Sequence, residues 1–68
     1  MKYFYVFTAT WQHATDMANM CYRGTINVGE TATREQVFNE IMTMCARQAA
    51  VKPERLTVLF YSLEPNKI

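Results

Sequence analysis

The chain has 68 residues, of which 50% are hydrophobic and 19% charged, and its formal net charge is +1. This length allows one small domain, residues 1–68, which buries only about 60% of the surface that the unfolded chain exposes. The hydrophobic content excludes a disordered tail, and a near-neutral chain without a basic run argues against a duplex-DNA binder.

The first predicted element is a β-strand over Lys2–Trp11, where aromatic and β-branched residues follow one another without glycine or proline. Alternation places every second side chain on the same face. One face then carries Tyr3, Tyr5, Phe7, Ala9 and Trp11, and the other carries Phe4, Val6, Thr8 and Thr10. Because both faces are apolar near the start, we expect this strand to be central in its sheet.

The polar, small residues of Gln12–Asn19 predict a loop. Met20–Val28 then alternates between an apolar and a polar side, which is typical of an edge strand in an antiparallel sheet. Gly24 within it indicates either a β-bulge or a place where an aromatic side chain lies across the backbone.

A helix is predicted from Thr33 to about Ala50, after a turn over Gly29–Ala32. Thr33 is a suitable N-cap, and Gln36 three residues later completes a capping box. The spacing of apolar residues gives the helix one buried side. That side holds Val37, Phe38, Ile41, Met44, Cys45 and Gln48, with Met42 outside it.

A second apolar strand is predicted over Arg55–Leu63, after Pro53 has ended the helix. The element order is ββαβ, and a right-handed helical crossover makes the second and third strands parallel. The first strand then fits between them, antiparallel to both. We therefore predict an α+β domain, a three-stranded antiparallel sheet of order 2-1-3 with one helix on one face.

The helix is expected to cover Phe4 and Val6, with either Val58 and Phe60 or Leu59 and Tyr61 of the third strand pointing inward. No element remains to cover the other face, and uncovered apolar patches usually mark an interface. We expect the partner-binding residues to come from the aromatic side chains of that face. They are Tyr3, Tyr5, Phe7, Trp11 and Tyr61. The expected partners are a second copy, forming a homodimer, and another protein.

Residues with catalytic or metal-binding chemistry are few. They are His13, Asp16, Cys21 and Cys45, without a paired spacing such as CxxC. We interpret Cys45 as a core residue and Cys21 as a half-exposed structural thiol, and no glycine-rich phosphate loop exists. We therefore expect no catalytic residue, cofactor or metal, and no enzymatic activity. The alternative, a small enzyme, would need a pocket joining His13 to one of the cysteines.

Nucleic-acid binding is the alternative function. Tyr22 and Arg23 lie next to each other on a strand of an aromatic-rich sheet, and sheet-based proteins of this kind stack unpaired bases. The absence of a surrounding positive patch makes this the second hypothesis after protein binding.

Three segments resemble the small accessory proteins of enterobacterial phages and prophages. They are YFYVFTATWQ, TREQVFNEIMTMCARQAA and LTVLFYSLEPN. The chain is also faintly similar to host cell-division-inhibitor-like proteins of that group, but their helices tend to be arginine-rich and this one has only Arg34 and Arg47. The resemblance implies a protein that binds and modulates a host macromolecule, with division, restriction, CRISPR interference and transcription machinery as eligible targets.

The compartment is expected to be cytoplasmic, bacterial or that of the host cell if a phage encodes the protein. The N-terminus shows no signal peptide, and no segment approaches the ~18 apolar residues of a membrane span. Two cysteines do not form the disulfide framework of a small secreted domain. A membrane partner is not expected.

Overall fold

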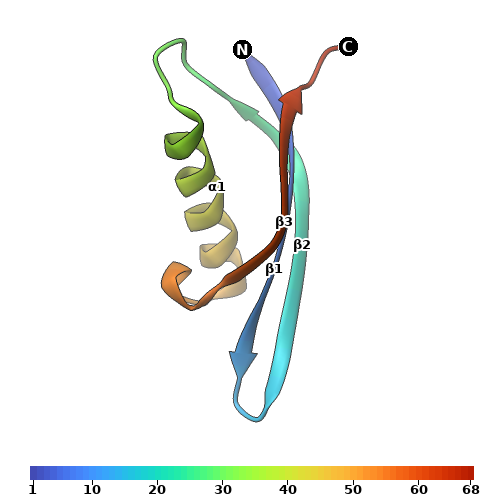
Figure 1. Cartoon of the computed structure of the whole chain (residues 1–68), viewed down its shortest axis with the longest axis vertical. Coiled ribbons are helices and arrows are strands. Elements are labelled where there is room, and N and C mark those ends of the chain that lie inside the picture. Colours follow the sequence, from blue (N-terminus) through green and yellow to red (C-terminus); the bar gives the residue numbers. More distant parts are fainter.

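The computed structural model describes all 68 residues, which form a three-stranded antiparallel sheet with one helix (Figure 1). The elements are β1 (Lys2–His13), β2 (Asp16–Asn27), α1 (Arg34–Ala49), a short 3₁₀ helix η1 (Pro53–Arg55) and β3 (Thr57–Pro65). The strand order is β2-β1-β3, with β1 antiparallel to both neighbours. The predicted ββαβ fold is therefore confirmed.

The hairpin of β1 and β2 is longer than predicted. Both strands have 12 residues, and His13 pairs with Asp16 across a two-residue turn in which Ala14 has φ of 55°. The loop expected over Gln12–Asn19 is thus wrong. A two-stranded ladder satisfies backbone N–H and C=O groups whatever the side chains are, so polar residues continue the pairing. The end of this hairpin extends past the helix in Figure 1.

The helix covers the opposite face of β1 from the one predicted. Tyr5, Phe7 and Ala9 are buried beneath it, whereas Phe4 is 38% exposed. Residues opposite each other in a sheet share a face, and the register decides which face is richer in apolar side chains. Tyr5 and Phe7 pair with apolar or small residues on both neighbouring strands, whereas Phe4 pairs with Thr25 and Glu64. The helix therefore packs on the odd-numbered residues of β1.

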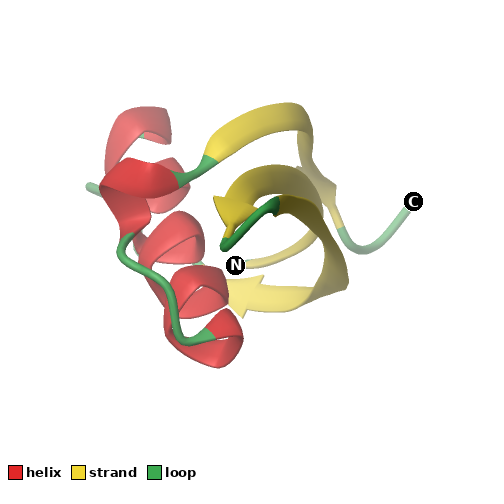
Figure 2. Ribbon diagram, turned by 90° about the horizontal axis from the view of Figure 1, so that it is seen from below, coloured by secondary structure: helices red, strands yellow, loops and turns green.

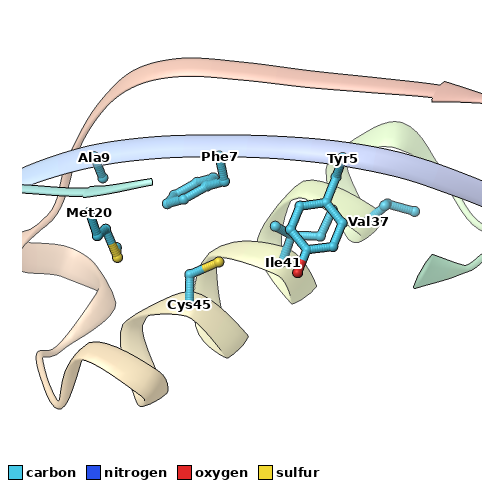
Figure 3. Close-up of a cluster of buried hydrophobic side chains, with 7 residues drawn as sticks. All are labelled: Tyr5, Phe7, Ala9, Met20, Val37, Ile41 and Cys45. Atoms are coloured by element: carbon cyan, nitrogen blue, oxygen red, sulfur yellow. The ribbon is translucent and has the colours of Figure 1, made fainter. Parts of the chain in front are cut away.

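The core lies between β1 and α1 (Figure 3). Phe7 is fully buried and its ring packs at 6.2 Å from Phe38 and 6.5 Å from Tyr61, measured between centroids. Phe38 and Tyr61 meet edge to face at 4.8 Å, a favourable arrangement for aromatic pairs. Two strands and the helix thus each contribute one ring to a single aromatic cluster.

The helix begins where the sequence predicts. Thr33 Oγ1 accepts a hydrogen bond from the Gln36 N–H at 3.1 Å, and Gln36 Oε1 accepts one from the Thr33 N–H at 2.9 Å. Its inner side is close to the prediction, with three differences: Gln48 is exposed, Met42 is half-buried against the core, and Ala46 is fully buried. The left-handed Ala50, with φ of 58°, ends the helix before Pro53.

Gly24 of β2 lies opposite Tyr5. A Cβ at Gly24 would lie 3.4 Å from the Tyr5 hydroxyl oxygen and 3.5 Å from its ring. This confirms the second of the two predicted roles for this glycine, because the aromatic ring lies across its backbone.

Strand β3 begins later than predicted, at Thr57, because residues 53–55 form η1. A register irregularity between Thr8 and Ala9 of β1 places a β-bulge at Leu59 of β3. Seen end-on, the twisted sheet has α1 on one side only (Figure 2). The molecule is elongated, with extents of 42 × 21 × 16 Å.

Candidate functional site

The predicted partner-binding aromatic residues lie on the helix side of the sheet. Tyr5 is 8% exposed and Phe7 is fully buried, so neither is accessible to a partner. Tyr3, Trp11 and Tyr61 are half-buried, and Tyr61 belongs to the aromatic cluster with Phe7. The expectation that these five residues line an uncovered face is corrected, since the cross-strand register turns all of them toward α1.

The residues predicted for nucleic-acid binding are separated. Tyr22 pairs with Phe7 and therefore lies on the helix side, where it is half-buried against the core. Arg23 pairs with Val6 on the other face and is exposed. Neighbouring strand residues point to opposite faces, so this pair does not form a single stacking site.

The side of the sheet away from α1, which we call the open face, carries a different apolar patch. Phe4 and Val6 of β1 and Phe60 of β3 point to it, and Phe60 is 56% exposed. Leu59, at the bulge, is 60% exposed beside them. The structural feature that distinguishes this patch is the pairing of Phe4 with the polar residues Thr25 and Glu64, a register that the sequence alone does not show.

Polar and charged side chains surround the patch. Lys2 and Arg23 contribute positive charge to the open face, and Glu64, opposite Phe4, contributes negative charge. The remaining positions of the face are mostly threonine, serine and asparagine. The open face therefore combines exposed aromatic rings and one arginine, residue types that are enriched at protein interfaces, with polar side chains around them.

The residues with catalytic chemistry are not brought together. Cys45 is buried in the core, where desolvation raises the pKa of its thiol and favours the protonated, unreactive form. Cys21 is exposed on the open face, where the Thr8 hydroxyl donates to its sulfur at 3.2 Å. His13 lies at the hairpin end and lines a cleft of about 390 Å³ with Trp11 and Arg55, which contains neither cysteine.

A smaller cleft of about 190 Å³ lies at the N-terminal end of α1. Tyr3, Val37 and Leu63 form its apolar wall, and Arg34 and Thr33 lie at its polar side. Its lining holds no histidine, cysteine or carboxylate. No group of three or more histidine, cysteine or acidic side chains in the molecule is placed to hold a metal ion.

No family model matches the chain, and no curated protein or solved structure matches it significantly. The only helix of any length, α1, is not long and apolar enough to cross a membrane. The function must therefore be inferred from the surface of the molecule. The most distinctive part of that surface is the open face with its exposed apolar patch.

Proposed function

We propose that the protein is a small, non-enzymatic binding protein that recognises a macromolecule through its open face. The observation that carries this proposal is the patch of Phe4, Val6 and Phe60 on the one face of the sheet that no element covers. A two-layer domain of this size has enough helix to cover one face only. The second face keeps exposed aromatic rings that a single chain has no means to bury.

The patch has the character of a protein-binding site. Aromatic residues and arginine are enriched at interfaces, and here Arg23 and Phe4 lie on adjacent strands of the same face. A few such residues usually supply most of the binding energy. Truncation of Phe60, the more exposed of the two phenylalanines, should therefore weaken binding more than truncation of any polar neighbour.

The resemblance to phage and prophage accessory proteins supports a host macromolecule as the partner, most simply a protein, in the cytoplasm. The resemblance implies action by binding and modulating that macromolecule. The open face suits this mode because its exposed apolar side chains are surrounded by polar and charged ones. The protein would modulate its target by covering a functional surface on it.

An affinity capture from nuclease-treated bacterial lysate tests this proposal. Wild type is compared with Phe60→Ala and with Met17→Ala, a matched control for an exposed apolar side chain at the far end of the same face. A host protein retained by wild type and Met17→Ala but lost from Phe60→Ala supports the proposal. Capture that is equal for all three contradicts it.

A second candidate function is the binding of single-stranded nucleic acid. The observation that favours it is the placement of two exposed aromatic rings, Phe4 and Phe60, on adjacent strands of one face that also carries Lys2 and Arg23. Sheet-based binders stack bases on such rings. Anisotropy with a labelled 20-nucleotide single strand should then show affinity that falls steeply between 50 and 300 mM salt. No binding, or affinity unchanged by salt, contradicts this candidate.

A further inference from the structure

The outer edge of β2 is long and carries no feature that blocks pairing. Met1 and Val28 exchange two backbone hydrogen bonds, N–H of Val28 to O of Met1 at 2.8 Å and N of Met1 to O of Val28 at 3.0 Å. Hydrogen-bonded pairs alternate along an antiparallel ladder, so even-numbered residues of β2 bond to β1. The odd-numbered residues from Met17 to Asn27 direct their N–H and C=O groups away from the sheet.

The other edge, β3, is protected. It is interrupted by the bulge at Leu59 and ends in Pro65, which lacks an N–H. Asn66 donates to the Lys2 carbonyl at 3.1 Å, so the same alternation turns Pro65 outward. Bulges and prolines are the usual means of preventing edge-to-edge pairing, and β2 has neither over its 12 residues.

The molecule also exposes more surface than a chain of its mass should. Its accessible surface is 5199 Å², whereas a compact monomer of 7.9 kDa exposes about 4,400 Å². Its radius of gyration is 12.7 Å, against about 11 Å for 68 residues. The excess of about 800 Å² is close to the area that each partner contributes to a stable interface.

We propose that a second copy of this chain pairs with the β2 edge, antiparallel and with Tyr22 at the two-fold axis. Residues whose N–H and C=O groups point away from β1 must lie opposite residues of the second copy that do the same. This register meets that condition from Met17 to Asn27. On the helix side, Met20 then lies opposite Gly24 of the second copy, so that a large side chain meets a small one. Ile26 lies opposite Ala18 of the second copy in the same way.

Charge is compatible with this pairing. Asp16 and Arg23 are the only charged residues of β2. Asp16 lies outside the paired stretch, and Arg23 lies opposite Cys21 of the second copy. No like charges directly oppose each other, the arrangement that destabilises strand pairs.

The product is a six-stranded sheet of order β3-β1-β2-β2-β1-β3. Because the two-fold axis is perpendicular to the sheet, both helices lie on one side and both open faces on the other. The two Phe4 and Phe60 patches then face the same direction, and one dimer presents a continuous surface with two equivalent binding patches.

The first test is analytical ultracentrifugation of wild type, Cys21→Pro and Cys21→Ala. Both variants lose the thiol, but only proline removes the outward N–H, which takes no part in the ladder with β1. Two intermolecular hydrogen bonds per dimer are lost, so the dimer of Cys21→Pro should dissociate about ten to a hundred times more readily. Cys21→Ala should behave as wild type. A monomeric wild type at 100 µM, roughly the upper limit for a weak dimer, overturns the proposal, as does a Cys21→Pro dimer of unchanged affinity.

The second test does not depend on the folding of the proline variant. In the proposed register, Arg23→Cys places a thiol opposite Cys21 of the second copy, at about 5.5 Å between Cα atoms, within disulfide range. Mild oxidation should give a covalent dimer, and Arg23→Cys in a Cys21→Ala background should not. Equal cross-linking in both backgrounds, or none in either, overturns the pairing. The pairing leaves Phe4 and Phe60 uncovered, so its failure would not affect recognition by the open face.

Discussion

Replacing one phenylalanine on each face of the sheet tests which face is the core. Phe7 is fully buried and packs against two aromatic rings. Phe→Ala at such a site costs about 3–5 kcal/mol. A domain of 68 residues has a total stability of about 3–10 kcal/mol. Phe7→Ala should therefore remove about a third or more of that stability, and it should unfold the protein if the total lies at the low end of the range.

Phe60→Ala should have a much smaller effect. Complete burial of a phenylalanine is worth about 1.5–3 kcal/mol, and Phe60 is 56% exposed. The loss should be about 1 kcal/mol or less, at least ~2 kcal/mol smaller than that of Phe7→Ala.

Urea denaturation followed by far-UV circular dichroism measures both changes, at one fixed protein concentration so that association contributes equally. Phe7→Leu, which conserves most of the volume, should lose only about 1.5 kcal/mol and gives a measurable curve if Phe7→Ala does not fold. A Phe60→Ala variant as unstable as Phe7→Ala would refute the assignment of faces.

Three further predictions concern stability and reactivity. Burial raises the pKa of Cys45, Tyr5 and Tyr61, so the unfolded chain releases these protons at lower pH than the folded one. The unfolding free energy should therefore fall as the pH rises above the ordinary thiol pKa of 9.0. A thermal midpoint that is unchanged between pH 8 and 11 would contradict this prediction. Thr33→Ala should lower the unfolding free energy by about 1 kcal/mol through loss of the N-cap, and the thermal midpoint by about 4–8 °C. Thr33→Ser should retain most of the stability that the cap contributes. Cys21 should react with a thiol reagent in the native protein, whereas Cys45 should react only after denaturant is added. Mass spectrometry measures this by counting the modified thiols.

The topology could be predicted because it depends on features that a single sequence displays. An unbroken run of aromatic and β-branched residues identified the first strand, and the helical spacing identified α1. Thr33 with Gln36 marked where that helix begins. The handedness of the crossover then left one arrangement with β1 in the centre. None of these steps requires knowledge of which residues face each other across strands.

The hairpin length could not be predicted by the same means. Its turn, Ala14–Thr15, lacks the Asn-Gly or Asp-Gly sequence that favours a two-residue connection. The flanking residues are polar, and composition alone assigned them to a loop. What holds them in strands is backbone pairing, aided at the end by Arg55, whose Nη2 donates to the Gln12 carbonyl at 2.8 Å from a position 43 residues away in the chain.

The misplaced binding site has a related cause. The face of β1 with the most aromatic side chains was expected to form an interface. A single helix, however, stabilises the domain most when it covers the face richest in apolar side chains. From Tyr3 to Trp11 every residue of β1 on the helix side is aromatic or alanine, and their partners on β2 and β3 are also apolar or small. A conspicuous aromatic series is thus the strongest reason to expect core. The residues proposed for recognition are those out of phase with that series, Phe4, Val6 and Phe60, which share their face with threonine and charged side chains. In a two-layer domain with one helix, the face with fewer apolar residues is the one free to bind a partner, and only the pairing register distinguishes it.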